Sequence, residues 1–335
     1  MSATHRSSVF EDPLREARLA VLGGRFQQGW NALRTLPAEV RGSPEGLLLG
    51  AMATWRLGEF ERSRTVAIQA RDGFRSRGDT DGEMRAENVA AAGAFALGDL
   101  AEAERGFNRA LSLADDLADD LMIARCANNL GNIAYYLART ETALSFYRLA
   151  IANFEKLAFW AGLAEGWLNS AIVLHDSGDF RTSREASERA IAAAERSGDG
   201  RILGQALAAR SETDIALGDL ALATVLAERA LTLAETHDHV VGEADARRVL
   251  AVLARHRAEP TLALELVTPA LKIAERVRDP WREAEILEEI GTIHATIGRT
   301  ADAIAAFNAA ARAFSVLGAE VRASKMRERS AALPT

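Results

Sequence analysis

The chain has 335 residues, of which 48% are hydrophobic and 26% are charged, with both signs mixed. Such a composition supports a folded core and excludes a wholly disordered chain. The formal net charge of -7 gives no basic footprint for nucleic acid, so we expect no nucleic-acid partner.

The sequence carries no targeting or membrane signal. Residues 1–9, which we expect to be disordered, contain no apolar core of a signal peptide. The most apolar run begins at Ile215, but Asp219 and Glu228 interrupt it well short of a membrane-spanning length. The single cysteine, Cys126, excludes an intrachain disulfide and is expected to be a buried apolar side chain. We therefore expect a cytoplasmic protein without a membrane partner.

A short motif around glycine recurs along the chain, at intervals of 40 residues or a multiple of 40. Alanine takes the place of glycine at Ala138 and Ala258, and Gly24 marks one further unit at the N-terminal end. Small residues recur five positions after each of the seven turns from Gly58 to Gly298, and alanine recurs twelve positions after each of the same seven turns. The glycines of the motif are Gly58, Gly98, Gly178, Gly218 and Gly298.

Each unit is predicted to form two helices of about four turns, because apolar residues recur every three or four residues on both sides of the turn. Glycine at the turn supplies the left-handed conformation that ends the first helix. The columns of small residues mark positions where neighbouring helices approach closely. A single pair cannot bury its apolar face, so the pairs are expected to stack into a solenoid with a continuous core.

The sequence resembles the tetratricopeptide repeat family. The family pattern is matched in pieces by Leu130 and Gly131, by Trp167, and by second-helix pairs such as Ala143 with Tyr147. The closing proline is missing and each unit is about six residues longer, as in kinesin light chains and some bacterial regulatory repeat domains. The resemblance implies an all-α fold, a right-handed solenoid of about eight helix pairs over residues 10–318, and a capping helix and tail over 319–335.

The resemblance also implies that the first helix of each pair lines a concave groove. Carrying the family's groove positions onto this sequence selects an amide patch, an aromatic stripe and two arginines as candidate residues for binding a peptide or partner. These candidates are Trp55, Arg85, Asn88, Phe95, Arg125, Asn128, Asn129, Asn132, Tyr135, Asn169 and His175.

The chemistry of these residues suits an extended peptide. A primary amide both donates and accepts hydrogen bonds, as the peptide backbone does, and arginine binds carboxylates through paired, charge-assisted bonds. The same positions in the C-terminal half are largely acidic, at Glu165, Asp245, Glu285, Glu288 and Glu289. Two alternatives stay open: the asparagines can bridge neighbouring helices, and the aromatic residues, with Tyr136, can belong to the packing between repeats.

No signature of catalysis, of a metal site or of a cofactor is present, and we expect a protein that is not an enzyme. The histidine cluster at 237–239 lacks a third strong ligand, and adjacent His175 and Asp176 diverge on a helix. The three lysines, Lys156, Lys272 and Lys325, are predicted to lie away from the groove. The first interpretation is an adaptor that captures a peptide or a partner's tail. The second is a bacterial regulatory module that senses a signalling peptide or small ligand.

Overall fold

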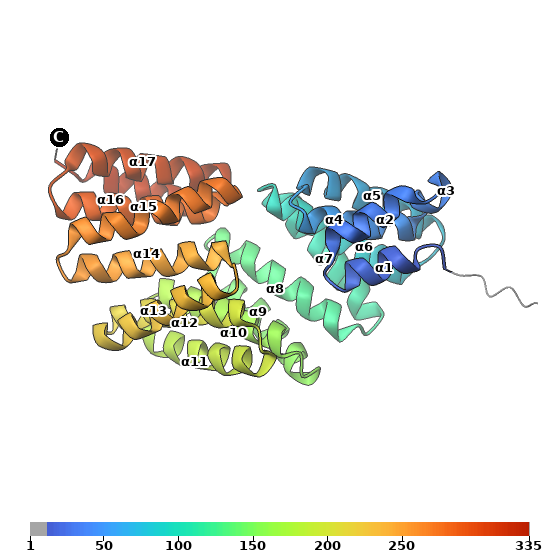
Figure 1. The fold of residues 1–335 in the computed structure, drawn as a ribbon, viewed down its shortest axis with the longest axis horizontal. Helices are drawn as coiled ribbons and strands as arrows, with labels where there is room; N and C mark the ends of the chain where they lie inside the picture. Colours follow the sequence, from blue (N-terminus) through green and yellow to red (C-terminus); the bar gives the residue numbers. More distant parts are fainter. Residues whose placement is uncertain (1–11, 335) are drawn as a thin grey trace, which may run out of the picture. The chain divides into compact units, whose positions relative to one another are not determined.

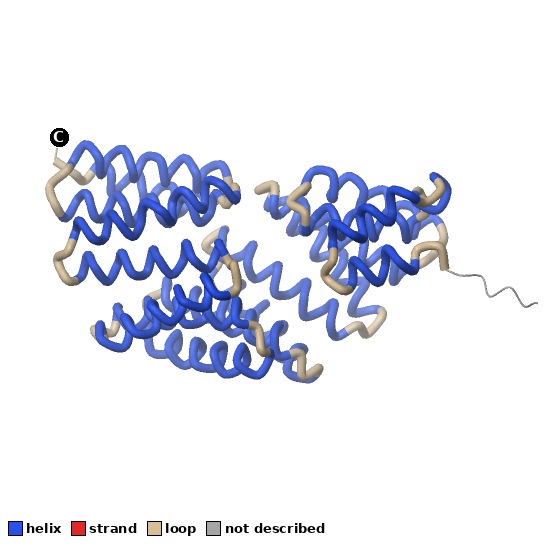
Figure 2. The backbone as a smooth tube through the Cα atoms, in the orientation of Figure 1, coloured by secondary structure: helices blue, strands red, loops and turns tan. Residues whose placement is uncertain are grey.

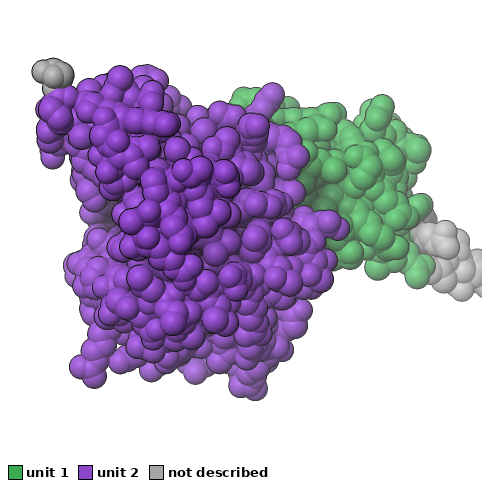
Figure 3. Space-filling view, turned by 60° about the vertical axis from the view of Figure 1, so that its left-hand side comes forward, with its two compact units in different colours: residues 1–119 green, residues 120–335 purple. Residues whose placement is uncertain are grey.

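The computed structural model describes residues 12–334, and within this range the chain consists of α-helices joined by short loops, without strands (Figures 1 and 2). The expected disorder of residues 1–9 lies outside the described range. The chain divides into two compact units, residues 1–119 and 120–335, which are coloured separately in Figure 3. Within the described range, no helix combines the length and the apolar character needed to cross a bilayer.

The described part of the first unit contains seven helices. They are α1 (Arg15–Leu22), α2 (Phe26–Thr35), α3 (Ala38–Arg41), α4 (Pro44–Arg56), α5 (Phe60–Ser76), α6 (Thr80–Ala96) and α7 (Leu100–Asp116). Consecutive long helices pack as pairs, α1 with α2, α4 with α5, and α6 with α7. The four-residue helix α3, which the repeat pattern did not predict, lies in the loop between the first two pairs.

The second unit continues the same arrangement with eleven helices. They are α8 (Asp120–Tyr136), α9 (Thr140–Lys156), α10 (Trp160–Asp176), α11 (Phe180–Ser197), α12 (Gly200–Ala216), α13 (Leu220–Thr236), α14 (Val240–His256), α15 (Pro260–Val277), α16 (Pro280–Thr296), α17 (Thr300–Val316) and α18 (Glu320–Ala331). The last of these packs on α17 as the predicted capping helix.

The loops explain the regular spacing of the helices. From Gly58 to Gly318, a residue with positive φ recurs every 20 residues, in the loops within pairs and in those between pairs. The residue that follows is the N-cap of the next helix, and in several loops it is an aspartate whose carboxylate accepts from the backbone of the first turn, as Asp99 does from Glu102. A left-handed residue ends one helix and an N-cap side chain starts the next, so each helix with its loop occupies 20 residues.

Small residues allow the helices to pack closely. Ala143 and Ala150 of α9 are fully buried. A Cβ atom on Gly131 of α8 would lie 2.4 Å from the ring of Tyr147, so this glycine makes room for the aromatic ring of its partner helix. Within the second unit, the first helices α8, α10, α12, α14 and α16 also contact one another in sequence. They therefore form the inner layer of the stack.

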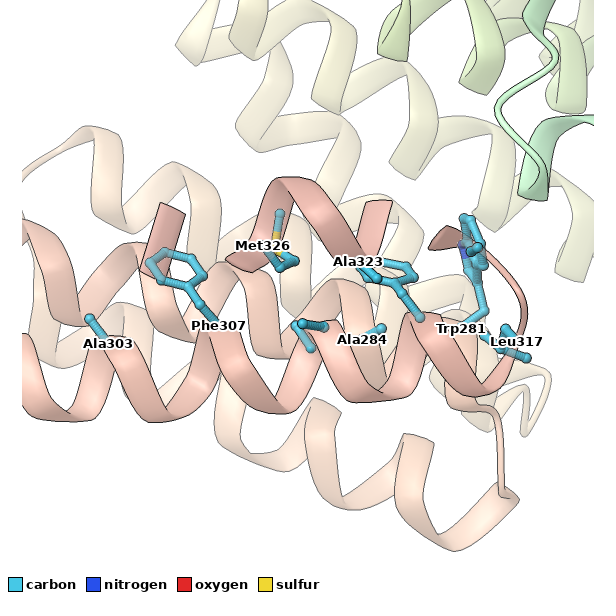
Figure 4. Close-up of a cluster of buried hydrophobic side chains, with 11 residues drawn as sticks. Trp281, Ala284, Ala303, Phe307, Leu317, Ala323 and Met326 are labelled. Atoms are coloured by element: carbon cyan, nitrogen blue, oxygen red, sulfur yellow. The ribbon is translucent and has the colours of Figure 1, made fainter. Parts of the chain in front are cut away.

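The capping helix α18 contributes its own apolar face to the core. Ala323 and Met326 are buried against α17, together with Phe307, and Trp281 of α16 belongs to the same cluster (Figure 4). These contacts hold α18 against the last repeat.

Candidate functional site

A cavity of about 920 Å³ lies within the second unit. Its wall is formed mainly by side chains of α8, α10, α12, α14 and α16, the inner layer of helices, and by α18. Ligand cavities of proteins have volumes of about 300 to 1,000 Å³. The cavity is therefore large enough for a small ligand or for several residues of an extended peptide.

Some of the predicted amides bond to other parts of the wall. Asn169 Nδ2 of α10 donates to Asn128 Oδ1 of α8 at 3.1 Å, and the Tyr147 hydroxyl of α9 donates to Asn132 Oδ1 at 2.8 Å. Asn128 is only 8% exposed. Asn128 and Asn132 therefore bridge neighbouring helices, which is one of the two alternatives that the sequence left open, while both line the cavity.

Other amides in the wall are available to a ligand. Asn129 of α8 and Gln205 of α12 line the cavity half-buried, and their side chains form no hydrogen bond with another described residue. Asn169 uses one of its amide protons for Asn128 and keeps its other proton and its oxygen. Three helices thus present donors and acceptors to the same space.

An aromatic contact joins α8, the first helix of this unit, to α16 near its end. The rings of Tyr136 and Trp281 are stacked, with centroids 3.8 Å apart and planes 2° apart. The Tyr135 hydroxyl donates to Asp176 Oδ2 at 2.7 Å and accepts from Arg322 Nη2 at 2.6 Å, and Arg322 also pairs with Asp176. Burial and the nearby Asp176 raise the pKa of Tyr135 well above its ordinary value, so the hydroxyl stays protonated. These contacts close the inner layer of helices around the cavity, linking α8 and α10 to α16 and α18.

Ion pairs between neighbouring first helices cover the acidic side of the cavity. Arg248 of α14 bonds to Glu212 of α12 at 2.7 Å, and Arg282 of α16 bonds to Asp245 of α14 at 2.5 Å. Arg255 bonds in the same way to Glu289 at 2.6 Å. Glu165 and Glu288 also line the cavity, and most of its lining residues are polar or charged.

Glu285 of α16 differs from the other carboxylates of the wall. Its nearest cationic atom is Arg322 Nη1 at 3.9 Å, which is beyond hydrogen-bond distance. Burial raises the pKa of Glu285 to about 7, although Arg248 and Arg322 oppose the rise. Its side chain is 24% exposed, through the cavity. Near neutral pH the protonated and the ionised forms of Glu285 therefore coexist, and the ionised form can pair with a cationic group of a ligand.

The remaining predicted residue of the second unit that lines the cavity is His175. Its Nδ1 lies 3.5 Å from the Thr213 hydroxyl, and its ring packs against Phe180 with centroids 5.3 Å apart. Arg125 of α8 is exposed and is not among the residues that line this cavity.

Four predicted residues belong to the first unit and do not line this cavity. Arg85 is exposed and pairs with Asp81 one turn earlier, at 3.1 Å. Trp55 packs edge-on against Phe60, with ring centroids 6.1 Å apart, which is the packing alternative. Asn88 and Phe95 are half-buried on α6.

The sequence interpretation missed the cations of the capping helix. Arg322, Lys325 and Arg329 all line the cavity, so the prediction that every lysine lies away from the groove is wrong for Lys325. The interval of three and then four residues between these cations places them on one face of a helix. The sequence therefore indicated that the three cations share a helix face, but only the fold shows that this face lines the cavity. Among the described residues, no group of three or more metal-ligating side chains is arranged to hold a metal ion.

Comparison with known proteins gives a family match over part of the chain and a structural likeness over most of it. Residues 82–156 match the tetratricopeptide repeat family. A Rap protein complexed with competence and sporulation factor is similar with a TM-score of 0.65 at 13% identity, covering 95% of each chain. NprR in complex with its cognate peptide NprX has a TM-score of 0.65 at 12% identity, covering 96% of this chain and 97% of that one. Aspartyl phosphate phosphatase F from Bacillus subtilis has a TM-score of 0.56 at 12% identity, covering 99% and 95%.

Comparison with curated protein sequences gave no significant match. At these low identities the structural likenesses establish the fold, and the sequence match establishes the repeats. Residues 82–156 match tetratricopeptide repeats, and the helix pairs before and after them continue the same stacked arrangement.

Proposed function

We propose that the chain is a non-catalytic scaffold that binds an extended peptide in the cavity of its second unit. The observation that carries this proposal is the row of available amides, Asn129, Asn169 and Gln205, on the inner-layer helices α8, α10 and α12 of one cavity. A peptide backbone offers N–H and C=O groups in alternation, and each amide can satisfy one of each kind. Two similar structures, NprR with NprX and a Rap conjugation gene regulator with the Phr* peptide, are peptide complexes and support this choice.

The proposal is tested with a random heptapeptide library displayed on phage. Peptides selected on the purified chain are synthesised, and their dissociation constants are measured by calorimetry for the wild type, for Asn129→Ala and for Asn153→Ala. Asn153 is the matched control, because it lies on α9 outside the cavity and bonds to the backbone of its own helix. We expect Asn129→Ala to weaken binding by about 0.5–1.5 kcal/mol, the net range of a neutral hydrogen bond, and Asn153→Ala to leave it unchanged. Failure to select any peptide, or equal affinities for the two variants, would overturn the proposal.

The contact between Tyr136 and Trp281 favours a regulatory version of the same function. A peptide that binds better to the form with the two rings in contact stabilises this contact, and a peptide that binds better to a form with the rings apart weakens it. The reason is that a ligand shifts an equilibrium between two forms only by its difference in affinity for them. Hydrogen exchange of the α18 amides, measured with and without a selected peptide, tests this version. Protection that changes on binding supports a regulator, and unchanged protection supports a passive adaptor.

A further inference from the structure

The side chain of Arg322 occupies a cage inside the cavity. Its guanidinium carbon lies 5.1 Å from the centroid of the Tyr135 ring and 5.0 Å from that of the Trp281 ring. Its nitrogens bond to the Tyr135 hydroxyl and to Asp176, and Glu285 lies 3.9 Å away. The ring centroid of Phe314 lies 5.9 Å from the same carbon, so three aromatic rings, a hydroxyl and two carboxyl groups surround one planar cation.

Arg322 is supplied by α18, which also neutralises the rest of the cavity. The described wall residues of α10, α12, α14 and α16 include seven carboxylates but only three arginines. The capping helix adds three cations, and one of them, Arg329, bonds to Glu288 at 2.7 Å and to Thr292 at 2.8 Å. Without α18 the wall would hold four more carboxyl groups than arginines.

The apolar side chains that anchor α18 are distinct from its cations, although the guanidinium groups of Arg329 and Arg322 also lie over the rings of Phe307 and Phe314, at 4.3 and 5.9 Å from the ring centroids. Ala323 and Met326 are fully buried in the apolar cluster beneath α18, where Figure 4 shows them beside Phe307 and Trp281. Arg322 is by contrast 23% exposed and lies on the cavity side. The helix can therefore keep its apolar anchor while its arginine leaves the cage by rotating about its own side-chain bonds.

We propose that this cage is an arginine-binding subsite of the cavity, and that Arg322 is an internal occupant which an arginine of the bound peptide displaces. The inference rests on the proposed function in one respect, namely that a peptide delivers the arginine. Arginine fits better than lysine, because its planar group stacks on aromatic rings while its fork of donors reaches the Tyr135 hydroxyl and Asp176 together.

Displacement has a thermodynamic consequence for affinity. The outgoing and the incoming guanidinium make the same contacts, so the cage itself gives little net gain in the wild type. Because Arg322 is tethered to the chain, its effective concentration at the cage is high. A competing arginine can bind only when Arg322 has left the cage, so its apparent affinity is reduced in proportion to the fraction of time that the cage is empty. Removing Arg322 should therefore raise affinity for an arginine-bearing ligand, which is the opposite of the effect expected for an ordinary structural residue.

The test uses N-acetyl-arginine amide as the probe and N-acetyl-citrulline amide, which is uncharged but has nearly the same shape, as its control. Both are titrated by ligand-observed NMR into the wild type, Arg322→Ala and Arg327→Ala. Arg327 is the matched control, because it lies on the same helix and pairs with Glu320 away from the cavity. We expect the arginine probe to bind Arg322→Ala at least about tenfold more tightly than the other two proteins, and the citrulline probe to bind none of them. Adding Asp176→Asn to Arg322→Ala should abolish the gain.

Equal affinity of the arginine probe for all three proteins, or no binding to a folded Arg322→Ala variant, would overturn the inference. Arg322→Met, which keeps the apolar stem, replaces the alanine variant if the latter unfolds. The two proposals fail separately in these experiments. Selected peptides that contain arginine and are sensitive to Asn129→Ala but indifferent to Arg322→Ala contradict the cage alone. Binding of the arginine probe without any selected peptide contradicts the peptide scaffold alone.

Discussion

Tyr136 and Trp281 lie far apart in the sequence, yet their rings are stacked 3.8 Å apart and nearly parallel. Tyr136 ends α8, the first helix of the second unit, and Trp281 lies in the first turn of α16. Most contacts in a solenoid are made between neighbouring repeats. This contact instead joins helices that are four pairs apart, and it closes the inner layer around the cavity.

A double-mutant cycle measures how much this closure contributes. Tyr136→Ala and Trp281→Ala are each expected to lower the free energy of unfolding, Trp281→Ala by about 3–5 kcal/mol because the side chain is 8% exposed and packs in a core cluster. The double variant should lose less than the sum of the two, by about 0.5–1.5 kcal/mol, the range for aromatic pairs. Urea denaturation of the four proteins gives the coupling. Strict additivity would show that the rings stack without stabilising the closed arrangement.

Asn132→Ala should lower stability even though its side chain lines the cavity. The Tyr147 hydroxyl, in a side chain that is 1% exposed, donates to Asn132 and would lose its partner. An unsatisfied buried hydroxyl costs about 1–3 kcal/mol. Thermal denaturation should therefore show a lower Tm for Asn132→Ala, whereas Asn129→Ala leaves Tm unchanged.

The control is the Asn132→Ala, Tyr147→Phe double variant, which removes both partners of the bond. Its stability should lie closer to that of the wild type than the stability of Asn132→Ala does. A double variant that is less stable than Asn132→Ala would contradict the assignment of this hydrogen bond.

Glu285 should make stability depend on pH near neutrality. Its pKa rises from 4.5 to about 7 on folding, so between these values the folded state keeps a proton that the unfolded state has released. The free energy of unfolding therefore falls as pH rises from 4.5 to 7, by at most about 3 kcal/mol, and levels off above 7. Glu285→Gln, which stays neutral at every pH, should remove this part of the slope.

Urea denaturation between pH 5 and pH 8 compares the wild type with Glu285→Gln and with Glu141→Gln, a carboxylate exposed on α9. The Glu141→Gln curve should run parallel to that of the wild type. A parallel curve for Glu285→Gln as well would show that the side chain is ionised throughout this range.

Ala258→Gly should stabilise the protein. Ala258 is exposed and has φ of 59°, a left-handed conformation that is unfavourable for a residue with a Cβ atom by about 1–2 kcal/mol. Part of this gain is offset by the greater freedom of glycine in the unfolded chain, so the net increase should be about 0.5–1 kcal/mol. Ala152→Gly, at an exposed position inside α9, should instead lower stability by about 1 kcal/mol. Thermal denaturation of both variants shows whether stability rises or falls in each. Equal changes in Tm for the two variants would refute the left-handed strain assigned to Ala258.

The sequence alone determined the all-helical fold and its division into pairs, because the signals involved are local. Gly58, Ala138 and their counterparts mark the turns through backbone conformation, and residues such as Ala150 mark close approaches of neighbouring helices. The left-handed residues between pairs, such as Gly78 and Ala158, follow the same 20-residue spacing, and the sequence interpretation did not use them.

Only the tertiary structure decided which groove residues share a site. Asn128 and Glu285 meet in one cavity, while Asn88, which occupies the same repeat position as Asn128, belongs to the other unit. The presence of Arg322 at Tyr135 depends on how the small rotations between four successive pairs accumulate and bring the capping helix back to α8. Repeat positions describe one pair and its neighbours, whereas this contact depends on the geometry of the whole stack, so no local pattern in the sequence encodes it.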